Sequence, residues 1–156
     1  MTASDLSRIE RKVLIHAPRE RVWRALTDIA EFSKWFSVEA AGAFTPGARV
    51  DMKSAYPGYE GASFYVVIER MDPPHTFSWR WHPGMHEPGF DPSVEPMTLV
   101  VFQLEEVAGG TELTVVESGF DQLSLARRAR VFADNQQGWE IQMSNVAKYL
   151  HAPARD

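Results

Sequence analysis

The C-terminal part of the sequence carries a long stripe with helical spacing, and this stripe constrains the fold more than any other feature. Between Ser124 and Leu150, apolar residues and one glutamine recur every three or four positions, as on one face of a single long helix. The stripe consists of Leu125, Ala129, Phe132, Gln136, Trp139, Met143, Val146 and Leu150. With a rise of 1.5 Å per residue, such a helix would be about 40 Å long, enough to cross a small sheet. Gly138 leaves open whether the helix is continuous, because an interior glycine destabilises a helix by about 1 kcal/mol relative to alanine.

The preceding residues have the pattern of a sheet. Short runs rich in β-branched and aromatic residues alternate with Pro and Gly turns. We expect strands over 9–16, 37–43, 49–54, 62–71, 76–82, 97–107 and 111–117. Gly109-Gly110 between the last two is typical of a hairpin. The short connections indicate antiparallel neighbours, because parallel strands need long crossovers.

Two short helices are expected between the first and second strands. Pro18 suits the first turn of a helix, and Asp28 and Glu31 have the spacing of a capping box for a second one. The fold class is therefore α+β, with a curved antiparallel sheet covered by the long helix. We expect a single domain over 9–150, a flexible segment 1–8 and a tail 151–156. Since a straight helix cannot touch a strongly curved sheet everywhere, a cavity between them is expected.

Composition excludes several function classes. The 156 residues include 16 Lys and Arg against 21 Asp and Glu, so the net charge is 16 − 21 = −5. This charge argues against nucleic-acid and anionic-membrane partners. The absence of cysteine removes disulfides, thiolate nucleophiles and cysteine-ligated metals. No membrane span, signal peptide, P-loop, dinucleotide fingerprint or nucleophile elbow is present, and we expect a cytoplasmic protein.

Several short motifs, taken in their order along the chain, resemble those of one superfamily. The segments 15–18, 22–28 and 32–36 are similar to the opening of START-like (SRPBCC) proteins, in the branch of the activator of Hsp90 ATPase C-terminal domain. Further matching segments are 77–79, 110–114, 117–120 and 138–139, so that the resemblance covers 9–150. It implies a helix-grip fold, in which about seven antiparallel strands wrap around the C-terminal helix and leave a hydrophobic pocket. It also implies a range of activities, from lipid carriage and hormone binding to polyketide cyclisation and co-chaperone work, so that fold does not settle function.

The aromatic residues are the main candidates for a binding site. Phe77, Trp79 and Trp81 alternate along one strand and share a face, and the same residues would also build an ordinary core. Together with the resemblance, they favour a pocket wall, in which Trp81 and Trp139 are the strongest candidates. The full set of expected ligand-binding residues is Trp35, Phe36, Trp79, Trp81, Phe102, Phe120, Gln136, Trp139, Met143 and Glu117.

The polar candidates leave binding and catalysis open. Gln136 or Glu117 could orient a ligand, and a buried Glu with a raised pKa could act as an acid or base. The proline-rich segment 82–96 could be a lid that brings Met85, His86 and Phe90 to the ligand, or a stiff connection between strands. We expect no catalytic residue, no metal site and no cofactor.

We therefore expect a protein that binds a small hydrophobic or amphipathic molecule. The alternatives are a cyclase- or hydrolase-type enzyme with an acid in the same pocket, and an interaction module similar to the Hsp90 activator. A chaperone partner is not expected, because eukaryotic co-chaperones carry a separate N-terminal domain for which this chain has no room. A homodimer is left open.

Overall fold

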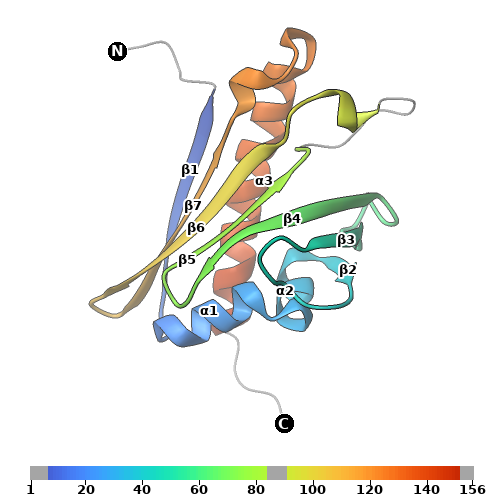
Figure 1. Cartoon of the computed structure of the whole chain (residues 1–156). Coiled ribbons are helices and arrows are strands. Elements are labelled where there is room, and N and C mark those ends of the chain that lie inside the picture. Colours follow the sequence, from blue (N-terminus) through green and yellow to red (C-terminus); the bar gives the residue numbers. More distant parts are fainter. Residues whose placement is uncertain (1–6, 84–90, 152–156) are drawn as a thin grey trace, which may run out of the picture.

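One antiparallel sheet and one long helix make up most of the molecule (Figure 1). The structure is a computed structural model that describes residues 7–83 and 91–151. The seven strands have the order β1-β7-β6-β5-β4-β3-β2, so that β2 to β7 form a meander and β1 adds to its last strand. The strands are β1 Arg8–Ile15, β2 Val38–Ala40, β3 Arg49–Ser54, β4 Ser63–Asp72, β5 Thr76–Trp81, β6 Thr98–Val107 and β7 Gly110–Ser118. The helices are α1 Arg19–Thr27, α2 Ile29–Phe36 and α3 Leu125–His151, with short 3-10 turns η1 Pro92–Val94 and η2 Phe120–Gln122.

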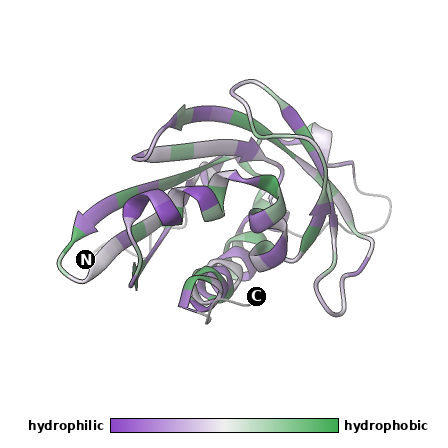
Figure 2. Cartoon of the chain, turned by 90° about the horizontal axis from the view of Figure 1, so that it is seen from below, coloured by the Kyte–Doolittle hydropathy of each residue, from purple (hydrophilic) through white to green (hydrophobic). Residues whose placement is uncertain are grey.

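The predicted fold class is confirmed, as are all seven strands and their antiparallel pairing. The bounds of β3 agree with the predicted 49–54, and the other strands differ mainly at their ends. The largest difference is β2, which has three residues where seven were expected. Figure 2 shows α3 almost end-on, with the strands curving around it and α1 and α2 beside it. None of the helices in the described part of the chain combines the length and apolar composition that crossing a bilayer requires.

The β6–β7 hairpin forms where the two glycines predicted it. Gly109 has φ +90°, which favours glycine, and Val107 pairs with Gly110 across the turn. Gly110 also lies against the end of β1, where a Cβ atom would come within 2.1 Å of the Ile15 carbonyl oxygen. The hairpin can therefore pack this closely on β1 only with glycine at position 110.

The helix pair after β1 is connected by Asp28. Its side chain accepts hydrogen bonds from the backbone N–H groups of Ala30 and Glu31 and so caps α2, as predicted. The Glu31 side chain does not complete the capping box. It accepts instead from Arg21 of α1 and from the Tyr149 hydroxyl of α3, and thereby joins three helices.

Helix α3 is continuous through Gly138, so the glycine causes no break. Four residues of the predicted stripe, from Phe132 onward, are buried: Phe132, Trp139, Met143 and Val146. The start of the stripe lies outside the core, since Leu125 is 81% exposed and Ala129 is also exposed. Phe120 and Leu123, which precede the helix, are buried in the core, so the first turn of α3 is not needed to cover it.

Candidate functional site: a cavity between the sheet and α3

A cavity of about 610 Å³ lies between α3, α2 and the adjacent ends of β4 and β5. Its wall is mainly aromatic on the sheet side and polar on the α3 side. The lining residues are Phe36, Tyr56, Tyr59, Ala62, Ser63, Phe64, Trp81, His82, Asp134, Asn135, Gln137, Gly138, Trp139, Ile141 and Gln142. A mostly apolar wall with a few polar groups is typical of small-molecule sites, whose volumes are about 300–1,000 Å³.

Three of the predicted ligand-binding residues line this cavity. Phe36 ends α2, Trp81 ends β5 and Trp139 lies at the middle of α3. Their rings are neighbours: the Trp81 and Trp139 centroids are 5.9 Å apart, and Phe36 lies 6.3 and 6.2 Å from them. Three elements that are distant in sequence therefore meet in one aromatic wall.

The other predicted aromatics are buried behind or beside this wall. Trp79 and Phe102 are fully buried, with ring centroids 6.4 and 5.7 Å from that of Trp139. Trp35 donates its indole N–H to the Ala25 carbonyl and joins α2 to α1. Phe120 packs on Phe132 at the far end of α3, and Met143 belongs to the core. None of these residues lines the cavity.

Glu117 is the most buried ionisable group in the described chain, with 0% of its surface exposed. Glu117 lies on the core face of β7, in line with Leu113 and Val115. One carboxyl oxygen, Oε1, accepts from Trp139 Nε1 at 2.8 Å and from Asn135 Nδ2 at 2.9 Å.

The second carboxyl oxygen of Glu117 connects the sheet to the same wall. Oε2 accepts from Trp81 Nε1 at 2.8 Å and from Thr98 Oγ1 at 2.5 Å. Burial raises the pKa of Glu117, although the four hydrogen bonds act to lower it. The carboxyl group thus holds both cavity-lining indoles by their N–H groups, one from β5 and one from α3.

The sequence prediction missed several polar members of this site. Gln136 is half-buried on α3 but does not line the cavity, whereas its neighbour Asn135 both lines it and binds Glu117. His82 lines the cavity, and its buried Nδ1 has no hydrogen-bond partner among the described residues. Burial lowers the pKa of His82, although Glu95 and Asp91 act to raise it, so its imidazole is mainly neutral at pH 7.

The proline-rich segment is described only at its ends. The proposed lid residues Met85, His86 and Phe90 lie outside the described residues. In the described C-terminal part of this segment, the Glu95 carboxylate accepts a hydrogen bond from the Ser124 backbone N–H and forms an ion pair with Arg127 at the start of α3. Within residues 7–83 and 91–151, no group of three or more His, Asp or Glu side chains could hold a metal ion.

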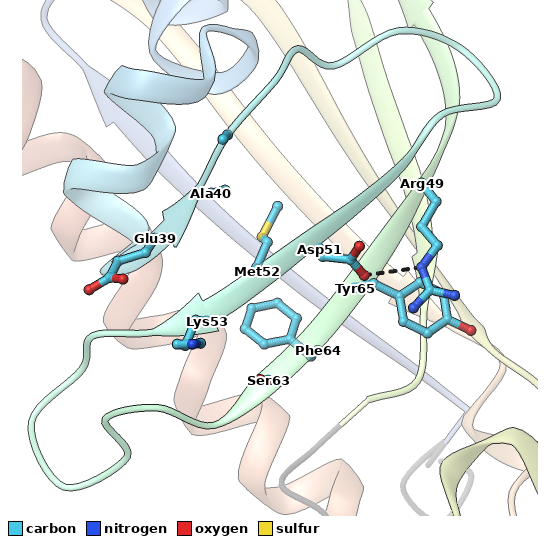
Figure 3. Close-up of a pocket in the computed structure, with 10 residues that line it drawn as sticks. Glu39, Ala40, Arg49, Asp51, Met52, Lys53, Ser63, Phe64 and Tyr65 are labelled. Carbon is cyan, nitrogen blue, oxygen red and sulfur yellow. Dashed lines mark hydrogen bonds and ion pairs between the residues drawn. The ribbon is translucent and has the colours of Figure 1, made fainter.

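A second depression, of about 700 Å³, lies over β2, β3 and β4 (Figure 3). Three of its polar residues contact one another: Arg49 Nε donates to Asp51 at 3.1 Å, and the Arg49 guanidinium lies 3.7 Å from the Tyr65 ring centroid. Both members of the Arg49–Asp51 pair are exposed, and exposed pairs of this kind are well solvated. The cavity beside α3 is therefore the stronger candidate site.

Comparison with known proteins agrees with the fold. The model of the family described as Activator of Hsp90 ATPase homolog 1-like protein matches residues 16–151. A protein of Mesorhizobium loti is 22% identical, with a TM-score of 0.74 and coverage of 92% of this chain and 96% of that chain. The Aha1 dimer of Colwellia psychrerythraea is 20% identical, with a TM-score of 0.69 and coverage of 92% and 95%.

A further similar structure is DynU16, from the dynemicin biosynthetic locus. It is 22% identical, with a TM-score of 0.69, and the match covers 94% of this chain but 48% of DynU16. At these identities the solved structures establish the fold and leave the ligand open. No curated protein matched the chain.

Proposed function

The chain belongs to the Activator of Hsp90 ATPase homolog 1-like family, and on this premise we propose that it binds a small hydrophobic or amphipathic molecule in the cavity beside α3. The observation that carries the proposal is the aromatic wall, in which Phe36, Trp81 and Trp139 from three elements line one space of about 610 Å³. Aromatic side chains supply large contact areas to such ligands. The polar side chains of α3 would orient the ligand.

Glu117 supports binding over catalysis. A general acid or base must come within hydrogen-bond reach of the reacting atom. Both carboxyl oxygens of Glu117 already accept two hydrogen bonds each, and the residue has no exposed surface. We therefore assign Glu117 the positioning of the two indoles rather than proton transfer to a substrate.

Gly138 allows a test that separates binding from folding. It lines the cavity, and a Cβ atom at this position would have no atom within 4 Å apart from its chain neighbours and the backbone of its own helix. Gly138→Leu should therefore place a side chain into the cavity without displacing the core, while the helix gains a better helix former. Gly138→Ala is the matched control, because it removes the glycine but fills little of the cavity.

The experiment is native mass spectrometry of gently purified protein, followed by titration of the retained compound class with tryptophan emission as the readout. We expect wild type and Gly138→Ala to bind, and Gly138→Leu to lose binding while remaining at least as stable as wild type. Equal binding by Gly138→Leu would refute this cavity as the site. Turnover of the retained compound would favour the cyclase or hydrolase alternative. Stimulation of a purified Hsp90 ATPase, with no ligand bound, would favour the interaction module.

A further inference from the structure

The charge of the cavity wall narrows the class of ligand. Among the described lining residues there is no Lys or Arg, and the ionisable ones besides two tyrosines are Asp134 and His82. Asp134 is an exposed acidic residue. Because burial lowers the pKa of His82, this side chain adds little positive charge. The described part of the wall therefore contributes an acidic side chain and no Lys or Arg that could pair with an anionic group.

The two indoles strengthen this preference. Trp81 and Trp139 both donate their N–H groups to the Glu117 carboxyl at 2.8 Å. A carboxyl oxygen that accepts a hydrogen bond from an indole N–H adds electron density to the ring and makes the ring faces more negative. Indole faces are already the best side-chain partners of a cation. Four more aromatic residues line the same cavity: Phe36, Tyr56, Tyr59 and Phe64.

We propose that the ligand of this cavity carries a cationic group, in the class of alkylammonium and quaternary ammonium amphiphiles, held by the aromatic wall and by Asp134. The proposal rests on the function proposed above and adds the charge of the ligand to it. An alkyl carboxylate or sulfate would meet Asp134 with no counter-charge from the wall.

Three probes that share one alkyl chain separate charge from hydrophobicity. They are decyltrimethylammonium and decyl sulfate, each titrated below its micelle concentration, and decanol, titrated below its solubility limit, with binding measured by calorimetry. We expect the cation to bind about tenfold more tightly than the alcohol, as for a desolvated cation on aromatic faces, and the sulfate to bind most weakly. If decanol or decyl sulfate binds as tightly as the cation, the charge assignment is overturned while the hydrophobic cavity stands. If none of the three binds, both proposals fail.

A charge reversal at the cavity wall provides the matched test. Asp134→Lys should weaken decyltrimethylammonium binding by about tenfold and strengthen decyl sulfate binding, since a unit charge acts strongly at short range. Glu140→Lys makes the same change of net charge on an exposed residue of α3 that does not line the cavity, and screening should keep its effect to about twofold or less. Equal effects of the two substitutions, or none from Asp134→Lys, would contradict a cation held at this wall.

Discussion

Replacing Glu117 by glutamine keeps the shape of the side chain and tests whether four donors converge on one carboxyl group. The amide nitrogen of Gln must take the place of one of the two oxygens. In the position of Oε2 it faces the N–H of Trp81 and the hydroxyl of Thr98, and only the hydroxyl can turn to accept. In the position of Oε1 it faces the N–H of Trp139 and the amide of Asn135, and only the amide can flip. Either way, one buried indole N–H loses its acceptor.

The expected cost follows from that lost acceptor. A buried donor left without a partner costs about 1–3 kcal/mol, so Glu117→Gln should lower the free energy of unfolding by about 2 kcal/mol at pH 7. The cost should depend on pH. Because burial raises the pKa of Glu117 above its ordinary value of 4.5, the folded protein binds more protons than the unfolded chain between the two values. This carboxyl group thus favours folding below pH 4.5, and the gain is lost as the pH rises through the raised pKa.

Urea unfolding at pH 7 and pH 5, followed by circular dichroism, measures both effects. The stability gap between wild type and Glu117→Gln should be wider at pH 5, since only wild type gains from protonation. Glu112→Gln on the same strand is the control, because Glu112 is half-buried on the outer face of β7 and should change stability by about 0.5 kcal/mol or less. A Glu117→Gln variant as stable as wild type at both pH values would refute the four-donor arrangement.

Three further substitutions and one control have expected outcomes that thermal or urea unfolding can check. Glu31→Gln should lower the free energy of unfolding by about 1–2 kcal/mol at pH 7. Burial acts to raise the pKa of Glu31, but its hydrogen bonds lower the pKa overall. The difference in stability should therefore shrink as the pH falls below 4.5 and through the lowered pKa. Gly110→Ala should cost about 3 kcal/mol or more, because the new Cβ meets the Ile15 carbonyl, whereas Gly42→Ala, with a positive φ but open space, should cost about 1 kcal/mol. Gly138→Ala should raise stability by about 0.5–1 kcal/mol, and a loss would show that the cavity wall at α3 is more tightly packed than the structure has it.

Most of the fold could be predicted from sequence because local patterns and tertiary packing agree. The two glycines at 109–110 mark a hairpin that the backbone adopts for the same reason, the positive φ of Gly109. The long stripe predicts α3 with its bounds correct to within one residue at each end. The exception is Leu125, which periodicity assigns to the core although it is exposed. Periodicity predicts which residues lie on the same face of a helix. It does not predict how far along the helix the core covers that face.

The site was less predictable because it depends on where distant elements meet. Glu117 was readable as a core position, since it continues the buried alternation of Leu113 and Val115 along β7. The hydrogen-bond donors to Glu117 could not be predicted, because they come from three other elements. On α3, Asn135 and Gln136 lie four and three residues before Trp139, and both spacings fit one helical face. Only the geometry shows that the residue four positions before Trp139 is the one that reaches the carboxyl group.

Glu117 also gives a physical reason for a cavity to persist beside α3. An aliphatic residue at this core position would leave Trp81 and Trp139 without buried acceptors for their N–H groups. The carboxyl group instead holds one indole on β5 and the other on α3, with 2.8 Å to each. Hydrogen bonds in a buried network fix side-chain orientation more strictly than apolar packing does. The two rings are therefore restrained from moving into the adjacent space. The free energy lost by burying the carboxyl group is thus offset by hydrogen bonds that keep the cavity open.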